Sequence, residues 1–313
     1  MIHLFQIKPE EKMVSRFQLN WLIDNQNAGK QLKELLKEKE ISRTALTDIK
    51  FKGGSIIVNN EPVNVRYILK EGDEVTVIFP AEIPSEGVKG EDIQLSILFE
   101  DEFLLVVNKP AGMNTIPSRE HPDGSLANAL VGYYQRAGLQ ATSHIVTRLD
   151  RDTSGIVLIA KHRHVHHLFS KMQQKGQVKR VYEAFAGGLL TENNGTIKEP
   201  IGRKADSIIE REVRMDGQYA CTHYHVIKRY PAFTYIELQL DTGRTHQIRV
   251  HMSHIGHPLL GDDLYGGSTA LLNRQALHCK EIRFNHPFIR EELTFTASIP
   301  ADMSQIIKAD LLR

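Results

Sequence analysis

A short buried strand directly after a charged turn is the strongest constraint in this sequence. The run Ile156–Ala160 is wholly apolar, and the turn formers Asp-Thr-Ser-Gly (152–155) come immediately before it. An apolar run of this length after a turn is typical of a buried strand. Asp150 stands just upstream, between Arg148 and Arg151. We therefore expect Asp150 on a rigid loop at a sheet edge, where functional residues concentrate, although a surface ion network would show the same pattern.

Composition and charge are those of an ordinary globular protein. The 313 residues are 41% hydrophobic with a net charge of +1, so the chain can bury a core and has no overall attraction to polyanions. Cys221 and Cys279 have no metal-binding or redox spacing, which favours a reducing compartment. No signal-peptide pattern is visible, and no apolar stretch reaches the roughly 18 residues that span a bilayer. We expect a cytoplasmic protein without a membrane segment.

The first part of the chain predicts a small α/β unit. Residues 29–39 place leucines at helical spacing opposite lysines, and Ser42 is a good N-cap for a second helix. The stretches 55–60 and 72–79 have strand patterns. A following segment mixes proline, glycine and charge without periodicity, as linkers do. The expected division is a domain of residues 1–82, a linker of 83–92 and a second domain of 93–313.

Strand patterns dominate the second domain. Apolar or alternating runs separated by turns recur at 95–99, 103–107, 178–186, 220–228, 233–240, 276–284 and 293–297. Helical spacing is confined to 125–136, part of 161–180, a segment from Thr245 and 302–312. Because few helices alternate with the strands, we expect an α+β fold on a mixed, mostly antiparallel sheet rather than a doubly wound parallel one.

The segment from Lys161 to Arg180 is strongly basic. It contains six Lys or Arg and four His but no acidic residue, and its apolar residues have helical spacing. Such a surface could contact a polyanion, or it could be an ordinary solvated helix face. The clustered histidines are accompanied by no cysteine or carboxylate, so we expect no metal site there.

A second motif combines arginines with carboxylates. Residues 241–251 (Asp-Thr-Gly-Arg-Thr-His-Gln-Ile-Arg-Val-His) close a strand and begin a helix that carries Arg249, and residues 257–266 form another constrained loop. No Ser-His-Asp or Cys-His order, phosphate-binding glycine loop or dinucleotide fingerprint accompanies them. We therefore expect chemistry by side chains alone, with neither cofactor nor metal.

Four motifs in this order resemble the RluA-type RNA pseudouridine synthases: NKPAGM, RLDRDTSG, KRVYEA and TGRTHQIRVHMSHIGHPLLGDDLYG. The resemblance covers roughly residues 93–300. Thr147 stands where that family usually has a histidine, which is not among its essential chemical groups. Residues 15–80 resemble the S-four-like RNA-binding module of translation proteins, which implies phosphate contacts that give affinity without reading sequence. The residues concerned are Lys37, Arg43, Lys50 and Lys52.

The resemblance implies an isomerase that cleaves the uridine glycosidic bond, rotates the uracil and rejoins it through carbon-5. Asp150 matches the family's aspartate, a nucleophile or stabiliser at the anomeric carbon, and Arg249 matches the arginine that pairs with it. Burial disfavours an ionised carboxylate, and a cation about 4 Å away offsets roughly 4 kcal/mol of that cost. Tyr182 matches the tyrosine that stacks on the base and is proposed to remove the carbon-5 proton. Ile248 would form an apolar wall beside the base.

RNA binding is implied in the same way. The target base must leave its stack, at a cost of a few kcal/mol, and Arg148 could fill the vacated space. Lys109, Arg151 and Arg244 are the expected phosphate contacts. Structured RNA loops are natural targets, and we expect a monomer that modifies ribosomal rather than transfer RNA.

Two other classes of function remain open. One is a non-catalytic RNA-binding or ribosome-assembly protein that keeps the fold, although it would have no reason to keep Asp150, Tyr182 and Arg249 together. The other is a nucleoside hydrolase, for which no second acid stands at a recognisable spacing.

Overall fold

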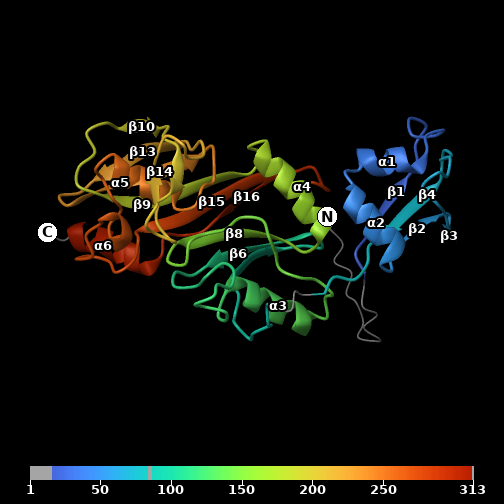
Figure 1. Ribbon diagram of the computed structural model, residues 1–313, viewed down its shortest axis with the longest axis horizontal. Helices are drawn as coiled ribbons and strands as arrows, with labels where there is room; N and C mark the ends of the chain where they lie inside the picture. Colours follow the sequence, from blue (N-terminus) through green and yellow to red (C-terminus); the bar gives the residue numbers. More distant parts are fainter. Residues whose placement is uncertain (1–15, 84–86, 312–313) are drawn as a thin grey trace.

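The computed structural model describes residues 16–83 and 87–311, which form a small sheet at one end of the molecule and a large sheet beside it (Figure 1). The small sheet is antiparallel, in the order β1-β4-β2-β3. Its unit contains β1 (Gln18–Leu22), α1 (Leu32–Glu38), α2 (Arg43–Phe51), β2 (Ser55–Val58), β3 (Glu61–Pro62) and β4 (Glu74–Ile78). The hydroxyl of Ser42 caps α2 by accepting from the amide of Ala45 at 3.1 Å. The helices and strands expected here are confirmed.

The large sheet contains ten strands. Eight follow the order β10-β13-β14-β9-β15-β8-β6-β5, while β16 pairs with β15 and β7 with β8. Their bounds are β5 (Ile97–Glu100), β6 (Leu104–Lys109), β7 (His144–Ile145), β8 (Ser154–Ala160), β9 (Lys179–Gly187), β10 (Asn194–Ile197), β13 (Thr222–Arg229), β14 (Phe233–Leu240), β15 (Leu277–Asn285) and β16 (Glu292–Thr296). Only β8 and β15 pair in parallel within this sheet. The expected α+β fold with a mixed, mostly antiparallel sheet is therefore confirmed.

Helices and a small hairpin surround the large sheet. They are α3 (Leu126–Ala137), α4 (Arg163–Gln174), α5 (Gln247–His254), α6 (Ala301–Leu311), the 3-10 turn η1 (Asp263–Tyr265) and the hairpin β11 (Ile201–Arg203)–β12 (Arg211–Val213). The helix expected from Thr245 begins later, at Gln247, because His246 has a left-handed backbone with φ of 57°.

Within the ranges that the structure describes, no helix combines the length and apolarity required to cross a bilayer. Residues 1–15 of the expected N-terminal domain and residue 312 of the expected C-terminal helix lie outside those ranges.

The apolar run forms an interior strand of the large sheet. Ile156 to Ala160 are all 0% exposed in β8, between β6 and β15. Gly155 has φ of 116°, and a Cβ at this position would lie 2.3 Å from the carbonyl oxygen of Cys279. Only glycine therefore allows β8 to approach β15 this closely, directly after the turn that carries Asp150.

Helix α4 lies between the large sheet and the small unit (Figure 1). Arg163, at its start, contacts Asp48 of α2 at 2.8 Å, and Lys171 pairs with Glu40. Next to the helix, the ring of His162 stacks on that of Phe17 with centroids 3.8 Å apart. The basic segment 161–180 is therefore in part an interface within the chain. Lys175 and Lys179 are exposed, and the expected contact of this segment with a polyanion stays a prediction. The division into domains at residues 82 and 93 stays a prediction.

Candidate active site

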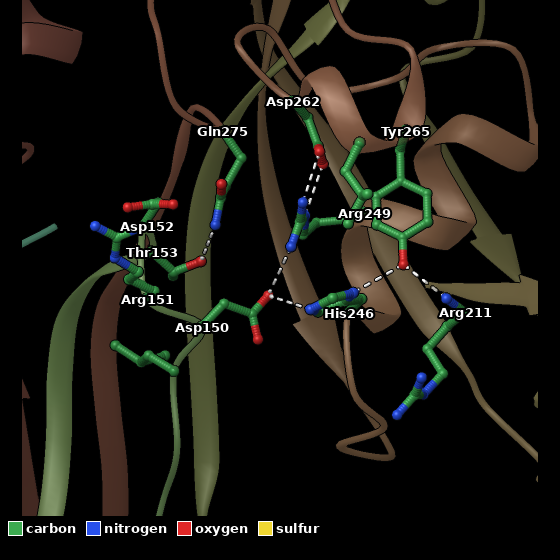
Figure 2. Close-up of polar contacts among 12 residues, drawn as sticks. Asp150, Arg151, Asp152, Thr153, Arg211, His246, Arg249, Asp262, Tyr265 and Gln275 are labelled. Atoms are coloured by element: carbon green, nitrogen blue, oxygen red, sulfur yellow. Dashed lines mark hydrogen bonds and ion pairs between the residues drawn. The ribbon is translucent and has the colours of Figure 1, made fainter. Parts of the chain in front are cut away.

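Asp150 lies on the loop that leads into β8, and hydrogen bonds hold this loop from several sides. Thr115 Oγ1 donates to the Leu149 carbonyl at 2.6 Å and accepts from the Leu149 amide at 3.2 Å. The Thr153 amide donates to the Asp150 carbonyl at 3.2 Å, and the Gln275 side chain donates to the Thr153 hydroxyl at 3.2 Å (Figure 2). The loop thus presents a half-buried carboxylate, with 28% of its side chain exposed.

Lys109, at the end of β6, holds this loop by hydrogen bonds. It is 1% exposed, and its ammonium donates to the carbonyls of Pro110, Met113 and Arg151 at 2.9, 2.8 and 3.1 Å. Burial lowers the pKa of Lys109 to about 8, although nearby aspartates act to raise it. An ammonium has three donors, and these contacts use all of them. The expected phosphate contact of Lys109 is therefore wrong: the residue ties the Asp150 loop to the turn after β6.

Arg249 on α5 approaches Asp150 but is bound mainly by another acid. Its Nη1 lies 3.4 Å from Asp150 Oδ2. Its Nε donates to Asp262 Oδ2 and its Nη2 to Asp262 Oδ1, both at 2.7 Å (Figure 2). Burial acts to lower the pKa of Arg249, but the hydrogen bonds and charge of Asp262 outweigh it and raise the pKa. The expected Asp150–Arg249 pair is present, and Asp262 is the partner that the sequence analysis missed.

His246 extends the polar network on the other side of Asp150. Its Nε2 lies 3.9 Å from Asp150 Oδ2, and its Nδ1 is 2.8 Å from the hydroxyl of Tyr265 (Figure 2). The Arg211 amide donates to that hydroxyl at 2.9 Å, which leaves the hydroxyl proton for His246 Nδ1. Burial lowers the pKa of His246, against the opposing charge of Asp150, and so favours a neutral ring. A neutral ring that accepts at Nδ1 carries its proton on Nε2, on the side of Asp150.

Tyr182 lies on β9 across a small hollow from Asp150. The Arg180 guanidinium donates to its hydroxyl at 3.0 Å. Burial raises the pKa of Tyr182, and the Arg180 cation acts in the opposite direction. Ile248 is 4% exposed and supplies an apolar side to the same hollow.

The hollow brings most, but not all, of the expected substrate-binding residues together. Arg148 and Arg244 line it and are exposed, whereas Arg151 is exposed but is not part of the lining. Figure 2 shows the Arg151 side chain directed away from the Asp150 carboxylate. The hollow has a volume of about 70 Å³, well below the roughly 300 Å³ at which ligand pockets begin. A whole nucleoside therefore fits only if side chains at the rim, such as Arg148 and Arg244, move aside.

Asp262, His246, Tyr265 and Arg180 were all missed as site residues. All four lie within the quoted motifs or next to them, but no spacing rule pairs them with Asp150. One signal was available for Asp262: a buried arginine needs an acidic partner, and the second constrained loop supplies two neighbouring aspartates.

The sequence and the fold match one class of enzyme. A model of the RNA pseudouridylate synthase family fits residues 103–254. The human protein "RNA Pseudouridylate Synthase Domain Containing 1" has a similar solved fold, with a TM-score of 0.56 at 22% identity over 72% of this chain and 97% of that one. At that identity the likeness concerns the fold alone.

Sequence relatives extend the match over nearly the whole chain. "Uncharacterized RNA pseudouridine synthase YjbO" of Bacillus subtilis is 52% identical over 279 residues, which cover 89% of this chain and 99% of the relative. "Ribosomal large subunit pseudouridine synthase D" of Xylella fastidiosa is 36% identical over 298 residues, which cover 90% of this chain and 89% of the relative. The chain therefore belongs to the RluA-type family of RNA pseudouridine synthases. It is an isomerase whose substrate is RNA.

Proposed function

We propose that the protein converts specific uridines of large-subunit ribosomal RNA to pseudouridine, with Asp150 as the group that reacts at, or stabilises, the anomeric carbon. The observation that supports this most directly is a carboxylate on a fixed loop, beside a hollow, with Arg249 Nη1 at 3.4 Å. Either role requires an ionised carboxylate, and a nearby guanidinium favours the ionised form. Asp262 keeps that guanidinium in place by binding its other two nitrogens.

The reaction would proceed on a uridine that has left its stack. Arg148, exposed at the rim, would take the space of the extruded base, since a planar guanidinium can stack between neighbouring bases. Cleavage leaves the bonding electrons on the uracil, which turns so that carbon-5 faces the sugar. After the new bond forms, carbon-5 gives up its proton. Tyr182 lies across the hollow for this step, and Arg180 would stabilise the phenolate that burial disfavours.

Ribosomal RNA is proposed as the substrate on the strength of relatives. Proteins named "Ribosomal large subunit pseudouridine synthase D" from Xylella, Xanthomonas and Vibrio are 34–36% identical over 90% or more of this chain. Mapping pseudouridine across all cellular RNAs in a strain that lacks this protein tests the assignment. Loss of one or more large-subunit positions supports it, whereas loss only from transfer RNA contradicts it.

The small N-terminal unit is proposed to bind RNA in the manner of an S-four-like module, within a protein that acts as a monomer. Its four candidate basic residues are all exposed, as phosphate contacts must be: Lys37, Arg43, Lys50 and Lys52.

Replacement of the carboxylate tests the proposed reaction. Asp150→Asn keeps the size of the side chain but removes its charge and replaces one acceptor oxygen with an amide donor. Pseudouridine formation should therefore be lost while RNA affinity stays within a few-fold. Asp152→Asn is the matched control, because Figure 2 shows that side chain directed away from Asp150. An active Asp150→Asn variant would remove this residue from the mechanism. A wild-type protein that binds RNA without modifying any would favour the non-catalytic alternative.

A further inference from the structure

A thiol, an imidazole and a carboxylate meet on the large sheet, outside the lining of the Asp150 hollow. Cys221 directly precedes β13, His223 lies on β13, and Asp241 directly follows β14. His223 Nε2 is 2.9 Å from Asp241 Oδ2 and 3.6 Å from Cys221 Sγ. The three possible ligand atoms all lie within 4.8 Å of one another, the one such group among the described residues. The spacing of the two cysteines gave no sign of it, because only Cys221 takes part and Asp241 is brought in by the neighbouring strand.

We propose that Cys221, His223 and Asp241 bind a divalent transition metal ion of the zinc class. With ordinary bond lengths, a tetrahedral zinc site separates its sulfur and nitrogen ligands by about 3.5 Å and its nitrogen and oxygen ligands by about 3.3 Å. The observed 3.6 Å between Cys221 Sγ and His223 Nε2 already fits. The 2.9 Å between His223 and Asp241 must open by a few tenths of an ångström as the ion replaces their hydrogen bond. A thiolate and an imidazole favour zinc over magnesium or calcium.

The surroundings orient the His223 ring and leave the site open to an ion from solvent. Thr196 Oγ1 is 3.0 Å from His223 Nδ1, so the hydroxyl fixes the ring and leaves Nε2 for the metal. The side chains of His223 and Asp241 are 42% and 53% exposed, so an ion can enter and a water molecule can complete the tetrahedron. A thiolate is the form of cysteine that binds metal, so the ion must displace the thiol proton of Cys221 when it binds.

The proposed site would fix the base of the turn that leads to the active site. The Cys221 amide donates to the Thr242 hydroxyl at 3.0 Å, and that hydroxyl donates to Gln247 Oε1 at 2.8 Å. Gln247 in turn donates to the Cys221 carbonyl at 2.9 Å and accepts from the Arg244 amide at 3.0 Å. The turn of residues 241–247 carries Arg244 and His246. A metal held by Cys221 and Asp241 would fix its start directly through Asp241 and its end through the hydrogen bond between Gln247 and the Cys221 carbonyl.

Metal titration of the reduced full-length chain tests the site. Zn²⁺ should bind with one ion per chain, and Co²⁺ should produce the absorption band of a thiolate–metal bond. Cys221→Ser should abolish that band. Cys221→Ser and His223→Gln should each weaken Zn²⁺ binding more than about tenfold, and Thr196→Val should weaken it about tenfold. His225→Gln is the matched control, because His225 is exposed on the same strand and bonds Asn194 instead.

Three results would overturn the proposal. They are no binding of Zn²⁺ by the folded protein, binding that Cys221→Ser leaves unchanged, and equal loss in His225→Gln. Hydrogen exchange provides a second measurement on the same samples. Zn²⁺ should slow exchange of the amides in residues 241–247 of the wild type and leave them unchanged in Cys221→Ser, and equal slowing in both would contradict this effect on the turn.

Discussion

Arg249 is bound more tightly by Asp262 than by Asp150. Two of its nitrogens lie 2.7 Å from the two Asp262 oxygens, while the third lies 3.4 Å from Asp150. The Asp262 side chain is 0% exposed and that of Arg249 is 8% exposed, so the pair is buried. Asp262 thus fixes the guanidinium plane, and the remaining nitrogen faces the carboxylate that is proposed to react.

Asp262→Asn should therefore damage both stability and activity. Removal of one partner from a buried ion pair leaves an uncompensated charge and costs about 3 kcal/mol or more. Urea unfolding should show this loss, and pseudouridine formation should fall strongly even under conditions where the variant is folded. Asp263→Asn is the control, because that neighbouring carboxylate is exposed. Equal effects of the two substitutions would exclude a specific role for Asp262.

Tyr265→Phe should separate the His246 contact from the rest of the site. The ring remains able to pack 4.9 Å from the Arg249 guanidinium carbon, but the Arg211 amide loses its acceptor and His246 Nδ1 loses its donor. Stability should fall by about 1 kcal/mol for the lost hydrogen bonds. If the network holds the His246 proton toward Asp150, kcat should fall more than KM changes, and the pH profile of kcat should shift. An unchanged pH profile would leave Tyr265 with a packing role only.

Tyr182→Phe tests the late step of the proposed reaction. The variant keeps the ring but loses the hydroxyl that accepts from Arg180. We expect uridine to be consumed without normal release of the carbon-5 proton, or turnover to slow strongly. Release of tritium from RNA labelled at carbon-5, compared with analysis of the nucleosides formed, distinguishes these results. Wild-type release would refute a role for the hydroxyl.

Local patterns predicted the scaffold well but predicted the partners of buried charges poorly. The run Ile156–Ala160 forms β8 and Ser42 caps α2, because periodicity and capping depend on neighbours in sequence. Lys109 was expected to contact phosphate, which requires an exposed side chain, yet it is buried. Its acceptors are backbone carbonyls, one of them 42 residues away, and carbonyls have no signature in a sequence.

The basic segment 161–180 shows the same limit over a longer range. Its acidic partners Asp48 and Glu40 lie 115 and 131 residues away along the chain. A basic helix that faces solvent and a basic helix at an interface have the same composition. Composition alone therefore does not show which surfaces meet. Asp262 was missed for a related reason. It stands 13 residues after Arg249, and only the path of the loop that follows helix α5 brings its carboxylate to the guanidinium.

The interface around α4 should make stability depend on pH. His164 is buried next to Phe79, and burial lowers its pKa from 6.5 to about 4, with a smaller contribution from His167 and opposition from Glu40. Between these values the unfolded chain binds more protons than the folded one, so the free energy of unfolding falls as the pH falls from 6.5 to 4. At about 1.4 kcal/mol for each pH unit, the full loss is about 3 kcal/mol.

His164→Phe should remove this part of the pH dependence. The His164 Nδ1 has no hydrogen-bond partner among the described residues, so a phenyl ring of similar shape loses no contact of that nitrogen. Urea unfolding at pH 7 and pH 5 should give a smaller difference for the variant than for the wild type. A residual dependence is expected, because His162 has a pKa lowered to about 4 by burial as well. Identical pH profiles would show that His164 does not titrate in this way.

The exposed basic residues of the small unit should govern how RNA affinity depends on salt. Each phosphate contact that is lost lowers the slope of log K against log salt by about 0.7 to 0.9. Lys37→Gln, Arg43→Gln and Lys50→Gln combined should therefore lower it by about two to three, with little change in the rate of modification at saturating RNA. Lys308→Gln, on α6 at the opposite end of the molecule, is the control for a general loss of charge (Figure 1). If the triple variant kept the wild-type slope, these residues would not contact phosphates, and the small unit would serve mainly to cover α4.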